Sequence, residues 1–176
     1  MLSGGLGMDV VEAIRTRRSI RKFKQCALDS NQVQAFKDAV RWAPSAHNLE
    51  SRKFYFVFDQ TKVKDLCAVT LNKFEPVMPL VVVACADCRR TGSLDKYAIM
   101  DVAASVENLL LAVHGLGLGA VWVGAFDAGE ARKILKIPDG FEPLVLVPIG
   151  MPTDPRRAGS RKRKRWKSPD GEKKWK

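Results

Sequence analysis

Three arginines and a serine lie within five residues of one another in the segment Arg17-Arg18-Ser19-Ile20-Arg21. A guanidinium group pairs with a phosphate or a carboxylate through two parallel hydrogen bonds, and a serine hydroxyl can donate or accept one. The segment therefore indicates an anion-binding site. Taken alone, it also fits a solvated basic turn, so it needs support from the rest of the chain.

A second candidate is the short polar segment Pro44-Ser45-Ala46-His47-Asn48. An expected helix stops at Pro44, because proline cannot continue a helix. The residues beyond it offer a hydroxyl, a side-chain amide and backbone N–H groups to the edge of a heterocycle. The plainer interpretation is a helix C-terminus followed by turn residues.

A third candidate is the glycine-rich, apolar segment from Gly117 to Gly124, which reads Gly-Leu-Gly-Ala-Val-Trp-Val-Gly. Glycine allows the backbone to approach a planar ligand closely. The segment runs into an expected strand, whereas the dinucleotide-binding fingerprint follows a strand and opens a helix. We therefore exclude a Rossmann-type nicotinamide site here.

The positive charge is concentrated near the C-terminal end. The net charge is +11, of which residues 156–176 supply +9 and the other 155 residues only +2. By itself, the run Arg161-Lys162-Arg163-Lys164-Arg165 fits a solvated tail or an electrostatic handle for nucleic acid or anionic lipid. Because the folded part is nearly neutral, we do not expect it to bind nucleic acid.

The cysteines and histidines give weaker signals. The CxxC pattern at 85–88 would need two more ligands to hold zinc, and Cys26 and Cys67 do not form a second pair. We interpret all four cysteines as structural and expect no metal site. His47 and His114 are the only histidines, and neither accompanies a Gly-x-Ser-x-Gly elbow. A histidine-based hydrolase is therefore not expected.

Hydrophobic periodicity locates the elements that must position these segments. A capping box at Asp9 and Glu12 opens the first expected helix. We expect helices over residues 10–16, 29–43, 61–71, 98–114 and 130–135, and strands over residues 53–58, 80–85, 120–123 and 144–149. Helices and strands alternate with connections of uneven length, which predicts an α+β fold with one central sheet between helices. The strand over residues 80–85 is apolar throughout and is expected to be fully buried.

The segment 98–114 is apolar almost all round, so it needs cover on most sides. In a chain of 176 residues, which is one domain's worth, a subunit interface is a natural source of that cover. Asp101, Glu107 and Asn108 interrupt the apolar run, so we do not expect a membrane span. Residues 1–7 are interpreted as a disordered or tag-like lead, and the scattered cysteines favour a reducing, cytoplasmic location.

Together these segments resemble the FMN-dependent nitroreductase family in its short, single-domain form. The resemblance extends from about Met8 to Lys164. Each motif is weak alone, but their order and spacing are specific. The motifs are the helix and arginine segment at 10–21, the Pro-Ser-Ala-His-Asn loop, the stretch from Asp101 to Gly124, the Pro-Ile-Gly-Met-Pro segment at 148–152 and the basic residues near 163.

The resemblance implies a three-layer α-β-α fold with a central, mostly antiparallel sheet, and a homodimer with an FMN in each of two interface clefts. Residues 8–165 would form the FMN-binding domain and residues 166–176 a basic tail. The implied FMN contacts fall into four groups. Arg17, Arg18, Ser19 and Arg21 hold the phosphate, ribityl chain and pyrimidine edge; Arg161 and Arg163 close on the phosphate; Pro44, Ser45, Ala46 and Asn48 of the other protomer contact the isoalloxazine ring; and Trp122, Val123 and Gly124 lie along that ring, with backbone amides near N5.

The implied activity is a ping-pong reaction in which NADH or NADPH reduces FMN, and a small electron-poor acceptor such as a nitroaromatic or a quinone then takes the electrons. The chemistry is centred on the flavin, so no side chain is assigned as a catalytic acid or base. An arginine near N1 would stabilise the negative charge of the reduced ring.

The chain departs from the family at one place that bears on the ring. Relatives commonly continue the Pro-Ser loop with Gln-Pro-Trp, whereas this chain has Glu50-Ser51-Arg52. We expect FMN binding to survive this change. The alternatives are a flavoenzyme of the same fold with another reaction (reductive dehalogenation or flavin fragmentation), a flavin carrier or sensor without turnover, and a basic nucleic-acid-binding protein.

Overall fold

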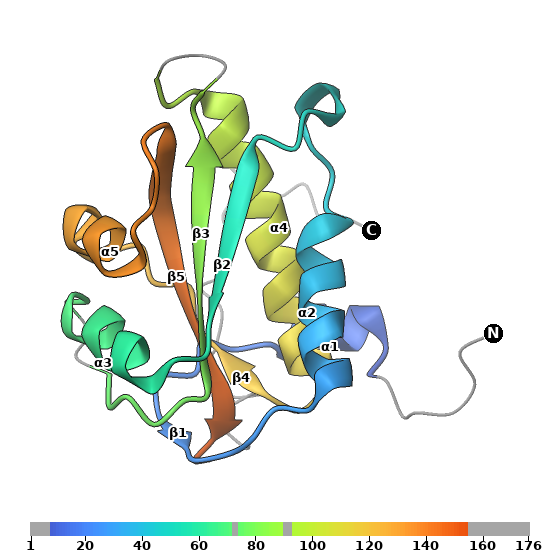
Figure 1. The fold of residues 1–176 in the computed structure, drawn as a ribbon. Helices are drawn as coiled ribbons and strands as arrows, with labels where there is room; N and C mark the ends of the chain where they lie inside the picture. Colours follow the sequence, from blue (N-terminus) through green and yellow to red (C-terminus); the bar gives the residue numbers. More distant parts are fainter. Residues whose placement is uncertain (1–7, 72–73, 90–92, 155–176) are drawn as a thin grey trace, which may run out of the picture.

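Helices cover both faces of one sheet in the structure, a computed structural model that describes residues 8–71, 74–89 and 93–154 (Figure 1). Residues 1–7 and the tail from 155 onward, with Arg161 and Arg163, lie outside the described residues. The helices are α1 (Val10–Thr16), α2 (Ser30–Arg41), the short 3-10 helix η1 (Ala46–Asn48), α3 (Gln60–Ala68), α4 (Lys96–Gly115) and α5 (Ala128–Leu135). The strands are β1 (Phe23–Lys24), β2 (Arg52–Val57), β3 (Leu80–Asp87), β4 (Gly119–Ala120) and β5 (Phe141–Pro152).

Each α-helix begins after an aspartate whose carboxylate accepts a backbone N–H of the first turn. At α2, Asp29 and Gln32 form a complete capping box. At α1, Asp9 accepts the amides of Val11 and Glu12, and the return bond from Glu12 is not seen among the described contacts. All five expected α-helices are confirmed, with ends that shift by up to three residues. The capping aspartates are Asp9, Asp29, Asp59, Asp95 and Asp127.

The sheet has the order β1-β5-β3-β2, with β4 also paired to β5, and all of these strand pairs are antiparallel. The residues from Leu80 to Ala86 are buried, which confirms the prediction of a fully buried strand. The alternation of β3 side chains sends Val82 toward one face and Val83 toward the other. The predicted α+β class is therefore confirmed.

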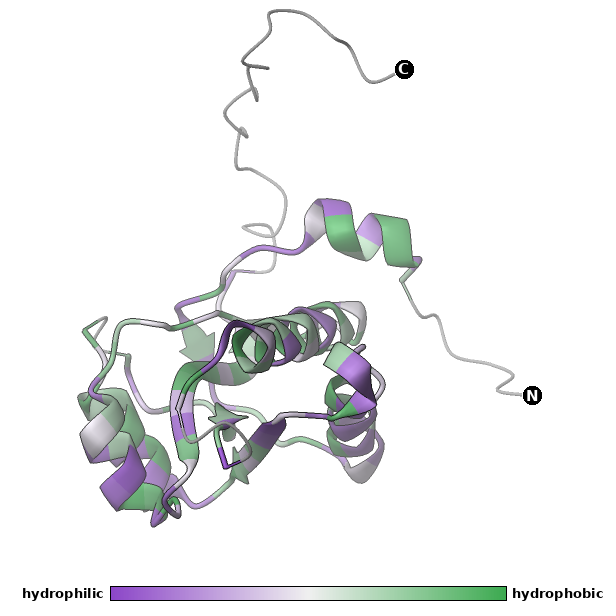
Figure 2. Ribbon diagram, turned by 90° about the horizontal axis from the view of Figure 1, so that it is seen from above, coloured by the Kyte–Doolittle hydropathy of each residue, from purple (hydrophilic) through white to green (hydrophobic). Residues whose placement is uncertain are grey.

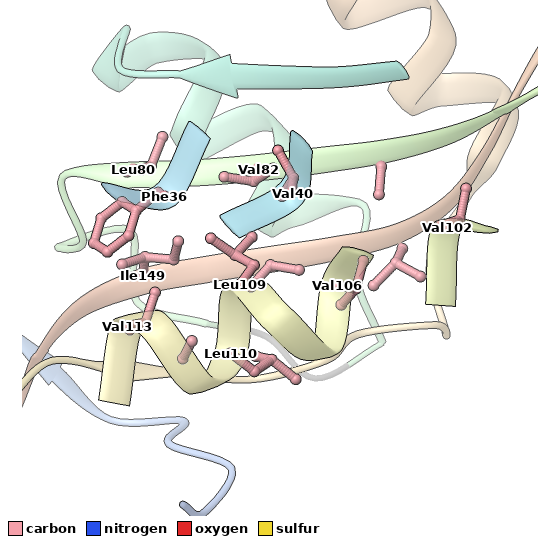
Figure 3. Packing of buried hydrophobic residues seen from close by; sticks show 14 of the residues in the cluster. Phe36, Val40, Leu80, Val82, Val102, Val106, Leu109, Leu110, Val113 and Ile149 are labelled. Atoms are coloured by element: carbon pink, nitrogen blue, oxygen red, sulfur yellow. The ribbon is translucent and has the colours of Figure 1, made fainter. Parts of the chain in front are cut away.

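The two faces of the sheet carry different helices, which makes three layers (Figure 1). On one face, α2 and α4 pack on β3 and β5; Figure 3 shows Phe36 of α2 and Leu109 of α4 in this cluster. On the other face, α3 and α5 cover the second cluster, which contains Val63 and Ala131. The predicted three-layer α-β-α arrangement is confirmed.

The strand expected over residues 120–123 is only partly correct. Strand β4 stops at Ala120, and Val123 then forms an isolated bridge with Leu146 of β5. Leu146 exchanges both backbone hydrogen bonds with Val123, so Pro148, two residues further along, faces the same edge without an N–H to donate. The ladder is interrupted at that point. The two-residue strand β1 and the helix η1 were not predicted.

Helix α4 supplies the largest share of the core on its face of the sheet. Among the described residues it is the one helix long and apolar enough, by length and composition, to cross a membrane. Its buried side includes Val102, Val106 and Val113, which pack on β3, β5 and α2 (Figure 3). A core helix passes the same length-and-composition test, and that is the role α4 has here.

Candidate functional site

The Arg17–Arg21 segment lies against β4, so two of the candidate motifs meet in space. The amide of Ile20 donates a 2.9 Å hydrogen bond to the carbonyl oxygen of Ala120, and Ser19 forms a parallel bridge with the same residue. A Cβ atom placed on Gly119 would lie 2.8 Å from Cγ1 of Ile20. The lack of a side chain at Gly119 is therefore required for packing against Ile20. From the sequence we had expected the glycines of this segment to make room for a planar ligand.

The arginines of this segment are held in different ways. Nε of Arg17 lies 3.6 Å from a carboxylate oxygen of Glu107 on α4, which is a long ion pair. Arg18 folds back and donates to the carbonyl oxygens of Arg15 and Arg17 at 2.8 and 2.7 Å. Arg21 is exposed, and the described part of the chain offers it no hydrogen bond or ion pair. The segment therefore keeps positive charge available for an anion.

His114 joins the end of α1 to α4 beside these arginines. Its Nε2 lies 2.8 Å from the Thr16 hydroxyl. Burial lowers the pKa of His114, and the positive charges of Arg17 and Arg18 lower that pKa further. The neutral imidazole is thus favoured, so His114 serves as a hydrogen-bonding link and adds no charge to the segment.

The residues after β4 differ in what they can offer a ligand. Trp122 is 39% exposed, whereas Val123 is buried. The amide of Val123 already donates to the carbonyl oxygen of Leu146 at 2.9 Å. Gly124 is exposed, and the described residues provide no acceptor for its amide. Of the amides implied for this segment, that of Val123 is occupied and that of Gly124 is available.

The loop from Pro44 to Ser51 lies beside the N-terminal half of α4. The backbone amide of Ala46 donates to Oδ1 of Asp101 at 2.9 Å. Three residues of the loop have positive φ: His47 at 51°, Asn48 at 56° and Glu50 at 49°. Left-handed backbone at non-glycine residues costs about 1–3 kcal/mol each and clusters at functional sites. The residue types of this segment identified it as a candidate in the sequence, but they did not predict its positive φ angles.

This loop and the arginine segment contact α4 at different positions along its length. The loop is bonded to Asp101, whereas Arg17 contacts Glu107, six positions later on the same helix, and Thr16 contacts His114, thirteen positions later. At 1.5 Å per residue, these offsets are roughly 9 and 20 Å along the helix axis. One chain therefore brings together the Arg17–Arg21 and Gly119–Gly124 segments, but it does not bring Ser45, Ala46 and Asn48 to them.

Arg52 secures the end of α2 that leads into the loop. Its guanidinium donates to the carbonyl oxygens of Ala43 at 2.9 Å and Arg41 at 3.2 Å. Cations stabilise a helix C-terminus by binding its unpaired carbonyl groups. The structural role of Arg52 was not recognised from the sequence.

Apolar side chains remain exposed on α1 and α4. Val10 and Ile14 of α1 are 61% and 51% exposed, and Met100 of α4 is 59% exposed. Figure 2 shows α1 at the edge of the molecule with hydrophobic residues along it. Exposed apolar side chains on two neighbouring helices are available for contact with another protein surface.

Among the described residues, the cysteines and the metal-binding residue types form no competing site. Burial raises the pKa of Cys67 to about 11 and that of Cys85 to about 12, so both thiols stay protonated and unreactive. Within the described ranges, no three histidine, cysteine, aspartate or glutamate side chains group as a metal site would require.

Comparisons with known proteins identify the relatives of this chain. A protein of Methanothermobacter thermautotrophicus, provisionally named an NADH dehydrogenase/NAD(P)H nitroreductase, is 30% identical over 157 residues, covering 84% of this chain and 79% of its own length. A nitroreductase family protein from Clostridium novyi has a solved structure with a TM-score of 0.77 and 28% identity, covering 84% of this chain and 87% of that one. An FMN-dependent nitroreductase from Clostridium difficile shares the fold, with a TM-score of 0.73 and 24% identity, covering 82% of this chain and 88% of that one.

The profile of the nitroreductase family matches residues 14–78 and 77–151. These ranges include the arginine segment, the Pro44–Asn48 loop, helix α4 and the segment around β4. This chain therefore belongs to the nitroreductase family.

Proposed function

We propose that this protein is a homodimeric, FMN-dependent oxidoreductase that passes electrons from NADH or NADPH to a small electron-poor acceptor. The observation that carries the proposal is the separation of two ligand-binding segments along α4. The arginine segment and Gly124 lie toward one end of the helix, and the Ser45 loop lies at the other. A second copy of the chain could supply the loop that each arginine segment lacks.

The exposed apolar surface supports the dimer. Met100 lies in the N-terminal half of α4, and α1, with Val10 and Ile14, lies beside the C-terminal half. Apolar surface is thus present toward both ends of the helix. If the α4 helix of a second copy crossed the first, it would bury this apolar surface. It would also place the loop of each copy near the arginines of its partner. Size-exclusion chromatography with light scattering tests this point, and a monomer would oppose it.

The donors of the site fit an FMN. Arg17 and Arg21 can pair with a phosphate, and the exposed Ser19 can donate a hydroxyl to it or to the ribityl chain. Gly124 offers an amide, and Trp122 offers an exposed apolar side chain against which a flat ring can lie. Arg161 and Arg163 are proposed as further phosphate ligands, although they lie outside the described residues.

When bound, FMN would supply the redox chemistry, since a flavin accepts a hydride from a nicotinamide and passes electrons on. The residues of the chain bind and orient: arginine charge favours an anionic ligand, and Trp122 limits water at the ring. The donor and the acceptor are proposed to enter the same cleft in turn, which is a ping-pong sequence. Nitroaromatics and quinones are the proposed acceptors, and the cytoplasm is the proposed location.

The proposal is tested first with the purified protein. Its absorption spectrum should show bound FMN, and anaerobic NADH or NADPH should bleach it until an acceptor restores the colour. Arg17→Ala should raise the Kd for FMN roughly 10- to 100-fold, because a hydrogen-bonded pair with a charged group contributes about 1.5–3 kcal/mol. Lys64→Ala is the charge-matched control, because Lys64 is exposed on α3, across the sheet from α4.

Three results would count against this function. A protein that stays colourless after incubation with FMN would show that it does not bind the proposed cofactor. FMN affinity that is equal in the Arg17 and Lys64 variants would show that the arginine segment is not the phosphate site. If the bound flavin is reduced but no acceptor reoxidises it, the protein is a flavin carrier and the proposed turnover is wrong.

A further inference from the structure

We infer that Asp101 is a positioning residue that sets the shape of the loop from Pro44 to Ser51 and thereby aims the Ser45 hydroxyl at the flavin. The identity of the ligand rests on the proposed function, whereas the anchoring of the loop rests on contacts within the chain. Asp101 belongs to α4, and the loop contacts that helix where the carboxylate emerges.

The carboxylate of Asp101 is shared between the two ends of the loop. Oδ1 accepts the amide of Ala46 at 2.9 Å, and Oδ2 accepts the amide of Ser51 at 3.3 Å. Asp101 is 3% exposed. In the described part of the chain no lysine, arginine or histidine forms an ion pair with it. Buried charge is costly unless it is hydrogen-bonded, so these two amides are what make the carboxylate tolerable at this position.

The loop held in this way determines what Ser45 can do. The amide of Glu50 donates to the Ser45 hydroxyl oxygen at 3.1 Å. A hydroxyl has one proton to donate and two lone pairs, so this contact uses a lone pair and leaves the proton. No acceptor for that proton is found among the residues that the structure describes. Ser45 is therefore set up to donate, which suits a carbonyl oxygen or ring nitrogen of a flavin.

The strained backbone explains why an anchor is needed. His47, Asn48 and Glu50 all have positive φ within four residues. Without a fixed point at each end, these residues would relax toward commoner conformations, and the Glu50 amide would leave Ser45. Asp101 bonds the loop near both of its ends, and its own helix is fixed in the core by the buried side chains of Val102 and Val106.

The test uses Asp101→Asn, Ser45→Ala and the double variant. Asparagine keeps the shape of aspartate but replaces one acceptor oxygen by an NH₂ group, which cannot accept from a backbone amide. Ser105→Ala is the matched control, because Ser105 is a buried polar residue of the same helix and, among the described residues, its hydroxyl bonds only the Asp101 backbone carbonyl, at 3.0 Å. FMN affinity, the visible spectrum of bound FMN and hydrogen exchange of residues 44–51 are measured for each.

We expect Asp101→Asn and Ser45→Ala each to raise the Kd for FMN roughly tenfold, and the double variant to bind little more weakly than either one, since both act through one hydroxyl. Both should shift the flavin absorption in the same direction. Only Asp101→Asn should speed amide exchange in the loop without FMN. Ser105→Ala should match the wild type in all three measurements.

The outcomes separate this inference from the proposed function. If the wild type binds FMN and Asp101→Asn matches it in affinity, spectrum and exchange, the inference is overturned. If the wild type binds no FMN, the proposed function fails, and exchange still decides the anchoring. Should Asp101→Asn not fold, the wild-type amides of Ala46 and Ser51 decide: slow exchange supports the anchor, and exchange as fast as an open loop refutes it.

Discussion

Replacing Gly119 by alanine tests how closely the arginine segment is held against β4. The added Cβ would lie 2.8 Å from Cγ1 of Ile20 and 2.9 Å from its Cβ and Cγ2. Carbon atoms prefer separations of about 3.5–4.0 Å. Rotating the Ile20 side chain cannot relieve the contact with its own Cβ, which is fixed to the backbone. The backbone at Ile20 must therefore move, and with it the hydrogen bond to Ala120.

The magnitude follows from the cost of overpacking a buried site, about 1–3 kcal/mol. For a chain of this size, each kcal/mol lowers Tm by roughly 2–4 °C, so we expect a fall of about 2–12 °C in thermal unfolding followed by circular dichroism. FMN should also bind more weakly, because Ile20 lies between Ser19 and Arg21.

Gly115→Ala provides the control for the same chemical change. Gly115 is the last residue of α4, and no atom lies within 4 Å of the position its Cβ would occupy. Alanine is favoured over glycine in a helix by roughly 0.5–1 kcal/mol, so Tm should stay the same or rise. If Gly119→Ala and Gly115→Ala gave the same Tm, the close approach of Ile20 to β4 would be refuted.

Two further predictions concern His114 and the thiols. The folded-state pKa of His114 is lowered, so the unfolded chain binds its proton more readily and stability should fall as the pH drops below about 6.5. Urea unfolding of His114→Gln between about pH 5 and 8 should show a shallower dependence on pH, and an unchanged slope would refute the assignment. Cys26 is partly exposed while Cys67, Cys85 and Cys88 are buried, so one thiol of the native protein should react with Ellman's reagent before the others. Rapid reaction of two or more thiols would contradict the described burial.

The sequence was sufficient for the elements whose signal is local. The buried strand β3 and helix α4 follow from apolar runs, and helix α2 follows from an apolar pattern behind its cap at Asp29. The break after Ala120 could not be predicted in the same way. It depends on Pro148 of β5 facing that edge of the ladder, which is a matter of tertiary register and leaves no mark in residues 120–123.

The candidate site shows the same division between local and tertiary information. Residue types identified the arginine segment and the Pro44–Asn48 loop. The roles of Gly119 and Asp101 were not recognised, because each depends on a partner far away in the chain, Ile20 or the amides of Ala46 and Ser51. In the sequence, Asp101 was only an interruption of an apolar helix. A lone carboxylate on the buried side of a core helix is the signal that could have identified it.

The separation of the two segments along α4 has a consequence for symmetry. In a two-fold dimer, a contact from the loop of one chain to the arginine segment of its partner is repeated in the opposite sense. Because the loop and Arg17 contact α4 six positions apart, roughly 9 Å along the helix axis, the dimer has two equivalent sites and not one shared site. The rigid helix would set the distance between each site's halves, while Asp101 and Glu107 contact the loop and Arg17 respectively. Under the proposed function, α4 is thus both the centre of the core and the element that fixes the geometry of both flavin sites.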